Sequence, residues 1–270
     1  MKQPLQDVAE QSLIRAIEEN VQEFLLELGR LGGGKERDEQ GIQWIIGGSP
    51  IDYHNCVVRA NLVQGQIDET VEALKQQLRA HQVPGTWHIG PSTRPLNLRK
   101  LLMERGFTYG GDEPGMAADL LALNRELPMP ADFVVERVSD EQELQIWTRI
   151  LGMGFGAGEI EANWVGEMYH KAGFDEQGAW HHFLGRWRGE PVATTTLFLE
   201  SGVAGIYFVF TLPQARRQGI GAAVTLAALQ DAQKRGYRIG VLGASQMGYP
   251  VYQRLGFQQY CTMSLYEWKP

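Results

Sequence analysis

Residues 206–222 of the chain read IYFVFTLPQARRQGIGA and contain three features in succession. An apolar run typical of a buried strand leads into a loop with two arginines and two glycines, and the apolar positions that follow predict a long helix. A helix start has unpaired backbone N–H groups and a partial positive charge, which favour a bound diphosphate. Gly219 and Gly221 let phosphate oxygens approach the backbone, while Arg216 and Arg217 add local positive charge. The segment therefore predicts a pyrophosphate-binding loop.

Two other kinds of phosphate loop do not fit the sequence. A dinucleotide-binding fingerprint needs a third glycine three residues after Gly221, and Val224 stands there. Residues 29–35 imitate a nucleoside-triphosphate loop, but Glu36 replaces the Ser or Thr that binds Mg²⁺, and a predicted helix precedes the loop instead of a strand. We interpret the glycine-rich residues 32–38 as a loop that links two elements.

With its flanking residues, the segment resembles the GNAT superfamily of acyl-CoA N-acyltransferases. The pyrophosphate motif of that family, Gln/Arg-x-x-Gly-x-Gly/Ala, is met by Arg216, Gly219 and Gly221. Residues 211–213 are similar to the strand exit of the family, and YQRLGF at residues 252–257 is similar to its Tyr-x-x-Leu-Gly-Phe segment. The resemblance covers about residues 132–270.

The resemblance implies an α+β fold, with a mixed and mostly antiparallel sheet that is splayed between its fourth and fifth strands to receive acetyl-CoA as cosubstrate, without a metal. It implies that Phe208, Val209 and Phe210 offer backbone groups to the pantetheine arm, and that the pyrophosphate lies on Arg216, Arg217, Gln218, Gly219, Ile220, Gly221 and Ala222. Ser245 follows the fifth strand, where relatives often carry an Asn that orients the cofactor, so this contact departs from the family pattern. Tyr252 matches the acid that protonates the leaving thiolate, since a phenol with its ordinary pKa of about 10 can still donate at neutral pH.

The base and the acceptor site are less well defined. Many relatives carry a carboxylate on the fourth strand, but residues 206–210 contain none. Deprotonation of the amine is left open between water and the side chains of Glu200, His181, His182 and Glu161. The adjacent histidines of a strand point to opposite faces, which disfavours a shared metal. Residues 155–164 lie where the family has acceptor-binding loops: Glu161 would attract a cationic amine and Trp164 would form an apolar wall, or the segment is a solvated loop with one core tryptophan.

The first half of the chain is similar to the second in the order of its predicted elements. Arg105-Gly106-Phe107 answers Leu255-Gly256-Phe257, which gives a period of 255 − 105 = 150 residues. Carboxylates at positions 68, 69 and 72 occupy the first turns of the helix where the second half has its phosphate loop, and Leu102 stands in the place of Tyr252. We therefore expect residues 1–128 to form a non-catalytic, degenerate GNAT-like α/β domain and residues 132–270 to form the N-acetyltransferase domain, with a boundary at the prolines of residues 128–130.

Periodicity and turn residues place the predicted elements. In the first half, helices are expected at 5–28, 67–82 and 96–105, strands at 43–46, 56–62 and 86–89, and either a strand or a helix at 114–123. In the second half, strands are expected at 133–136, 180–187, 192–200, 205–210, 238–242 and 261–268, and helices at 140–151, 220–235 and 250–255, with Ser139 or Asp140 as the N-cap of the first of these.

Charge and composition restrict the class of protein. A net charge of −7 argues against a nucleic-acid or anionic-membrane partner, because both need a basic surface. The two cysteines, Cys56 and Cys261, have neither a disulfide pattern nor metal-ligand spacing. The chain has no apolar stretch of about 18 residues and starts with an amphipathic segment, so we expect a cytoplasmic protein. Its oligomeric state stays open.

The sequence thus predicts transfer of an acetyl group from acetyl-CoA to a primary amine of a small molecule or peptide, by direct attack in a ternary complex. Two alternatives stay open. One is an acyl-CoA-binding sensor or structural module without turnover, and the other is acetylation of a protein lysine or N-terminus.

Overall fold

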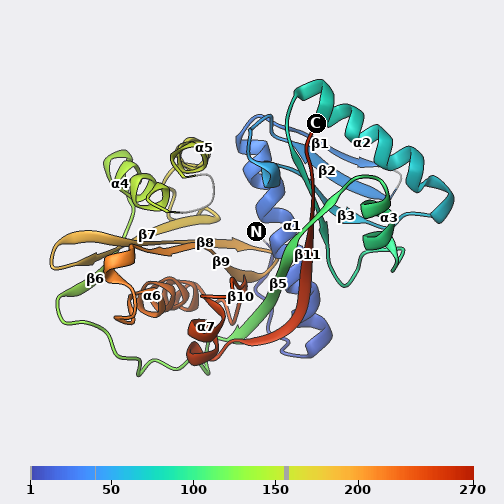
Figure 1. Cartoon of the computed structure of the whole chain (residues 1–270). Coiled ribbons are helices and arrows are strands. Elements are labelled where there is room, and N and C mark those ends of the chain that lie inside the picture. The colour runs from blue at the N-terminus through green and yellow to red at the C-terminus, as the bar shows by residue number, and fades with distance from the viewer. Residues whose placement is uncertain (1, 40, 155–157) are drawn as a thin grey trace. The chain divides into compact units, whose positions relative to one another are not determined.

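The computed structural model describes residues 2–39, 41–154 and 158–270 and divides into two compact units (Figure 1). Unit 1 comprises Met1–Val21 and Pro114–Tyr260, and unit 2 comprises Gln22–Glu113 and Cys261–Pro270. The chain passes from one unit to the other within α1 (Glu10–Leu31), β5 (Thr108–Asp119) and β11 (Gln258–Trp268). Residues 128–130, the predicted domain boundary, lie within unit 1, so the compact units and the predicted domains divide the chain differently.

Unit 1 is a mixed sheet with helices on both faces (Figure 1). Its strand order is β5-β10-β9-β8-β7-β6, and only the β9–β10 pair is parallel. The strands span Phe133–Arg137 (β6), Trp180–Trp187 (β7), Glu190–Glu200 (β8), Val203–Thr211 (β9) and Ile239–Gly243 (β10). Helices α4 (Glu141–Gly152) and α5 (Glu159–Ala172) cover one face, and α6 (Ile220–Lys234) and α7 (Tyr249–Leu255) cover the other. The predicted α+β class is confirmed.

Local signals in the sequence determine several of these elements. Asp140 caps α4, because its carboxylate accepts the N–H of Glu143 at 2.9 Å, as predicted for this position. The β7–β8 hairpin turns at Arg188 and Gly189, which have φ angles of 54° and 82°. Left-handed backbone of this kind is what tight hairpin turns require.

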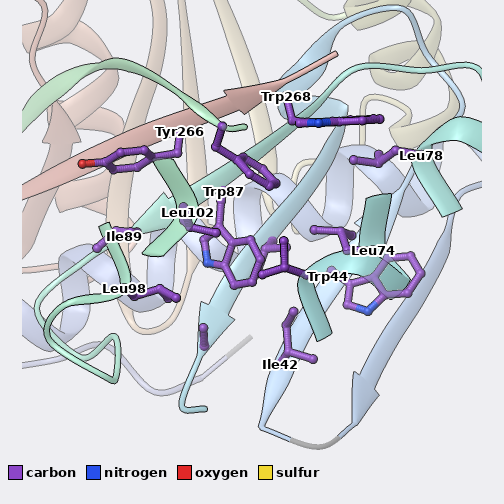
Figure 2. Packing of buried hydrophobic residues seen from close by; sticks show 14 of the residues in the cluster. Ile42, Trp44, Leu74, Leu78, Trp87, Ile89, Leu98, Leu102, Tyr266 and Trp268 are labelled. Carbon is purple, nitrogen blue, oxygen red and sulfur yellow. The ribbon is translucent and has the colours of Figure 1, made fainter. Parts of the chain in front are cut away.

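Unit 2 is a smaller sheet of order β1-β2-β3-β4-β11, in which only β3 and β4 are parallel. Its elements span Lys35–Glu39 (β1), Ile42–Ile46 (β2), Asn55–Ala60 (β3), Ile67–His81 (α2), Gly85–Ile89 (β4) and Leu98–Glu104 (α3). Figure 2 shows apolar side chains of β2, α2, α3 and β11 around Trp87 of β4, whose side chain is fully buried. This cluster gives unit 2 a core of its own.

The predicted internal duplication is confirmed in the elements. The order β2-β3-α2-β4-α3 of the first half repeats as β8-β9-α6-β10-α7 in the second. Both short helices end at a left-handed glycine, Gly106 with φ 85° and Gly256 with φ 109°. The N–H of Phe107 then bonds to Leu102 O at 3.1 Å, and the N–H of Phe257 bonds to Tyr252 O at 3.0 Å. Leu102 therefore occupies the position of Tyr252, as the sequence predicted.

The closing strand of each unit comes from the other half of the chain. β5 follows α3 in the sequence, and its C-terminal part pairs with β10 in unit 1. β11 follows α7, and its C-terminal part pairs with β4 in unit 2. The two halves have thus exchanged their last strands, a feature that nothing in the sequence pattern indicated.

The structure corrects three sequence predictions about secondary structure and settles a fourth that had two alternatives. The first helix begins at Glu10 and not at residue 5, because the N–H of Leu5 bonds to Gly202 O at 2.8 Å. Residues 35–39 form edge strand β1 and not a loop. Its side chains are charged, so the alternation of apolar and polar residues that predicts a strand is missing. Residues 159–164 belong to helix α5 and are not a loop, whereas residues 155–157 lie outside the described chain. Residues 114–119, left between strand and helix, are part of β5.

Candidate functional site

Strands β9 and β10 diverge and leave a cavity in unit 1. Their parallel pairing consists of Ala204 with Gly240 and Gly205 with Val241, whereas β9 runs on to Thr211. A cavity of about 450 Å³ lies beside this free end of β9. It is lined by the end of β9, the start of α6, the turn that follows β10, and α7. The predicted splay between the central strands is therefore present, and it opens onto the predicted loop.

The start of α6 presents bare backbone to this cavity. Gly219 has φ 82°, and a Cβ at this position would overlap Pro128 O, so both the conformation and the space require glycine. The amides of the first turn after it have no acceptor inside the helix. At Gly221 the nearest atom to an added Cβ is Thr211 Oγ1, at 3.6 Å. This surface is open to an anion.

Three arginines, Arg216, Arg217 and Arg254, line the cavity, and no carboxylate is found among the lining residues that the structure describes. Arg216 is held in place at the end of β9: its Nε donates to Thr211 O at 3.0 Å, and its guanidinium lies 5.7 Å from the ring centroid of Phe210. The remaining guanidinium N–H groups are free of that bond and can donate to phosphate oxygens. The cavity is thus locally positive in a protein whose net charge is −7.

A β-bulge interrupts β9 next to the cavity. Thr194 lies opposite Phe210 and Thr196 opposite Tyr207, so Phe208 and Val209 together face one residue of β8. Phe208 has φ 49°, and its carbonyl accepts the Thr194 hydroxyl at 2.9 Å. The bulge takes the following backbone out of the regular ladder, and Val209 and Phe210 line the cavity.

Tyr252 lies on α7 at the wall of the cavity. Its side chain is 8% exposed, and burial raises the pKa of its phenol to about 12. The hydroxyl therefore stays protonated across the physiological range and can donate a proton. Its ring packs against Gly248, where an added Cβ would lie 2.8 Å from Cε2. Ser245 stabilises the same turn, because its Oγ accepts the N–H of Gly248 at 3.1 Å.

The cavity brings together most of the residues that the sequence singled out. Ten of them line it: Val209, Phe210, Arg216, Arg217, Gly219, Ile220, Gly221, Ala222, Ser245 and Tyr252. Phe208 and Gln218 are not among the lining residues; Phe208 is buried, and Gln218 is exposed in the loop before α6. Sequence reasoning missed Arg254, although its place two residues after Tyr252 in the same motif was a usable signal.

The four side chains considered as a base all lie outside the cavity lining. Glu200 ends β8 at the hairpin opposite Val203, at the other end of β9. His181 and His182 point to opposite faces of β7, and burial lowers their pKa values to about 4 and about 3. The ring of His182 stacks on Tyr169 with centroids 3.8 Å apart, which is a packing role. Glu161 is buried on α5, and Trp164 on the same helix is half-buried.

Unit 2 has closed the corresponding gap between its own parallel strands. The N–H of Arg94 donates to Ala60 O at 2.9 Å, and Arg94 O accepts the N–H of Leu62 at 3.0 Å. The segment after β4 therefore bonds along the end of β3, where β9 in unit 1 is open to the cavity. At the start of α2, Asp68 accepts Arg105 Nε at 2.7 Å, so carboxylate stands where unit 1 offers bare amides.

Within the described ranges, no group of three His, Cys, Asp or Glu side chains is arranged to hold a metal ion. Over the same ranges, every helix is too short or too polar to cross a bilayer.

The splayed strands, the open helix start and the bulge are features of the GNAT fold. Residues 150–257, in the second half of the chain, match the model of the Acetyltransferase (GNAT) family. No curated protein matches the chain.

Solved structures extend the GNAT fold to the whole chain. A GCN5-related N-acetyltransferase from Kribbella flavida matches with a TM-score of 0.73 and 19% identity, over 94% of this chain and 95% of that one. A tandem GNAT protein from the clavulanic acid biosynthesis pathway matches with a TM-score of 0.60 and 13% identity, over 84% and 78%. A GCN5-related glucosamine N-acetyltransferase region of a fungal multi-domain protein matches with a TM-score of 0.63 and 13% identity, over 90% and 34%. At these identities the likeness concerns the fold.

Proposed function

We propose that the protein transfers an acetyl group from acetyl-CoA to a primary amine of a small molecule or peptide, by direct attack in a ternary complex. The observation that carries the proposal is the cavity of unit 1, where the bare start of α6, three arginines and the protonated Tyr252 meet beside the free end of β9. Each of these groups suits a different part of an acyl-CoA.

The cosubstrate is expected to lie along the gap between β9 and β10. Its pyrophosphate would accept the amides of Gly219 to Ala222 and the guanidinium groups of Arg216 and Arg217. Its pantetheine amides would pair with the free backbone of Val209 and Phe210, in place of the missing neighbouring strand. Ser245 still has its hydroxyl hydrogen to donate, since its oxygen is the acceptor of the Gly248 bond.

The chemistry then follows from groups around the bulge. The amine nitrogen attacks the thioester carbonyl, a C–N bond forms, and backbone N–H groups released by the bulge stabilise the oxyanion. The C–S bond breaks, and Tyr252 donates its proton to the leaving thiolate. The proton of the amine passes to water, because none of the described residues that line the cavity is a carboxylate or a histidine.

The first half of the chain is proposed to be non-catalytic. Arg94 closes its strand gap by backbone hydrogen bonds, Asp68 stands at its helix start, and Leu102 replaces the tyrosine. These three differences support a role in shaping or stabilising the protein. A sensor that binds acyl-CoA without turnover remains the second candidate, and Tyr252 at the cavity wall favours catalysis over it.

The proposal is tested by release of free thiol from acetyl-CoA with a panel of amines. The panel includes spermidine, tyramine, glycinamide and a lysine peptide, and also glucosamine, because an amino sugar is named for one protein of the same fold. We expect turnover with at least one of them. Thiol release with none, in a protein that binds coenzyme A, would identify a sensor.

Tyr252→Phe separates catalysis from binding. Removing a general acid is expected to lower kcat by about 100-fold or more, because the thiolate must then leave unprotonated. The dissociation constant of coenzyme A, measured by calorimetry, should stay within about twofold, since the ring that packs on Gly248 is retained. Tyr260→Phe is the matched control, because Tyr260 lies outside the cavity lining and its hydroxyl donates to Gln258 Oε1 at the long distance of 3.4 Å. Equal turnover in wild type and Tyr252→Phe would remove the acid role.

A further inference from the structure

The peptide group between Phe208 and Val209 lies at the centre of the bulge in β9. Both residues stand outside the pairs that β8 forms with β9 in the described structure. The carbonyl of Phe208 accepts the hydroxyl of Thr194 at 2.9 Å, and Thr194 is fully buried on β8. A side chain of the neighbouring strand therefore holds this carbonyl, where a backbone N–H would hold it in a regular ladder.

The direction of this carbonyl fixes the direction of the next amide hydrogen. The bond between Phe208 and Val209 is trans, and in a planar trans peptide the C=O and the N–H point in opposite directions. Because Phe208 O points towards Thr194 of β8, the N–H of Val209 points away from β8. On that side the parallel pairing of β9 with β10 has already ended, and Val209 lines the cavity. Thr194 thus directs an amide hydrogen towards the cavity from outside its lining.

The ring of Phe208 is held separately from its carbonyl. Phe208 has φ 49°, a left-handed backbone that residues other than glycine adopt only where their surroundings determine it. Its ring lies edge-on to Trp147 of α4 and Tyr169 of α5, with centroids 6.2 Å away in both cases. Rotation about the bonds on either side of the peptide would leave the ring in place, so these contacts do not set the direction of the carbonyl. The hydroxyl of Thr194 does.

We propose that Thr194 is a positioning residue that aims the N–H of Val209 at the carbonyl oxygen of the bound thioester. This inference rests on the proposed function, in which backbone amides at the bulge stabilise the oxyanion. An N–H that already points at the developing charge needs no reorganisation during the reaction. If the peptide turned over, the carbonyl of Phe208 would face the thioester oxygen, and two partial negative charges would repel each other. One buried hydroxyl thus decides which end of a peptide dipole faces the substrate.

Infrared spectra of bound acetyl-CoA test the inference without turnover. A hydrogen bond to the thioester carbonyl lowers its stretching frequency, and a carbon-13 label in the acetyl group separates this band from those of the protein. The frequency in wild-type protein should lie below that in buffer. It should return towards the buffer value in Thr194→Val, which replaces the hydroxyl by a methyl group of similar size. It should stay low in Thr194→Ser, which keeps the hydroxyl.

Thr195→Val is the matched control for these measurements. Thr195 is the next residue of β8 and is equally buried, and its hydroxyl has no hydrogen-bond partner among the described residues. Loss of that hydroxyl should therefore leave both the band and the turnover at their wild-type values.

Kinetics of the same variants separate turnover from binding. Thr194→Val should lower kcat by about tenfold, less than the roughly 100- to 1,000-fold loss on removal of an oxyanion donor, because the N–H is still present but is no longer held. Thr194→Ser should stay within about threefold of wild type, because its hydroxyl can still donate to Phe208 O. The dissociation constant of coenzyme A, which has no acetyl carbonyl, should change by less than about twofold in every variant, since a single hydroxyl outside the cavity lining is altered.

Three results would each overturn the inference: a wild-type band at the buffer frequency, a Thr194→Val band equal to that of wild type, or a Thr194→Ser band as high as that of Thr194→Val. If the valine protein does not fold, Thr194→Cys replaces it. Its thiol is a weak donor, so its band should lie between those of wild type and buffer, and a band equal to that of wild type would again contradict the proposal. Failure to bind acetyl-CoA would defeat the proposed function as well. Thiol release with none of the amines would defeat the proposed function alone, because the spectra are recorded without an amine.

Discussion

Gly221→Val is expected to abolish tight binding of coenzyme A without harming the fold. Gly221 is the second residue of α6 and lines the cavity, and the nearest heavy atom to an added Cβ is Thr211 Oγ1, at 3.6 Å. A Cβ is therefore accommodated in the protein alone, and we expect the γ-carbons of valine to extend into the cavity. Since glycine is a poorer helix former than valine by about 0.4 kcal/mol, the free energy of unfolding should stay within about 0.5 kcal/mol of wild type.

The loss of affinity follows from the phosphate contacts that valine would block. The two γ-carbons would stand over the amides of the first turn, and we expect two hydrogen bonds to phosphate oxygens to be lost. At about 1.5 kcal/mol for each bond to a charged group, the loss is about 3 kcal/mol, or roughly a 150-fold rise in Kd. Gly221→Ala should have a much smaller effect, because a single methyl group is the size that the family motif tolerates.

Calorimetric titration with coenzyme A and urea unfolding of the same samples measure both quantities. Gly65→Val is the matched control: Gly65 precedes helix α2 in unit 2, and an added Cβ there meets no atom within 4 Å. It should leave the affinity unchanged. A Gly221→Val protein that is stably folded and binds coenzyme A within threefold of wild type would show that the pyrophosphate does not lie at the start of α6.

Two further predictions concern stability. His54 and His88 have pKa values lowered by burial to about 4, against about 6.5 in an unfolded chain, so below pH 6.5 the unfolded state takes up protons that the folded state does not. The stability present above pH 6.5 should therefore fall as the pH drops towards 4, by about 1.4 kcal/mol per pH unit for each histidine; a urea midpoint that is constant from pH 7 to 5 would contradict this. A Cβ on Gly166 of α5 would lie 2.6 Å from Thr148 Oγ1, so Gly166→Ala should lower the free energy of unfolding by about 1–3 kcal/mol and Thr148→Ala should restore most of it; no rescue would mean that the clash lies elsewhere.

The predicted phosphate loop and the fold around it could be located in the sequence because few residue types suit the backbone there. Gly219 must adopt a left-handed backbone where a Cβ would meet Pro128, and the motif spacing then places Arg216 and Gly221 on the same cavity. Gly106 and Gly256 revealed the duplication for a similar reason, since each ends a helix with positive φ. Positions that only glycine can occupy can therefore be recognised from a single sequence.

Other features could not be read because they depend on partners far away in the chain. The sequence around Phe208 does not indicate a positive φ, which accompanies the bulge in the pairing of β9 with β8. Asn20 looks like an ordinary polar residue of an amphipathic helix until Tyr207 and Glu200 are seen beside it. The charged sequence of β1 gave no alternation, because an edge strand with exposed side chains needs none. In α5, the buried Ala162, Val165 and Tyr169 do follow helical spacing, but the glycines that precede them are also typical of a loop.

The exchange of β5 and β11 means that neither half of the chain can be removed without loss of a strand from the other half. A chain cut after residue 128 would keep β5 but lose β11, which would leave β4 with a bare backbone edge. A chain that began at residue 132 would lack β5 and expose β10 in the same way. Exposed edges of this kind recruit other strands and promote aggregation. The first half can therefore lack a binding site and still be required, because it supplies strand β5. Without β5, strand β10 of the second half would have no partner on that side.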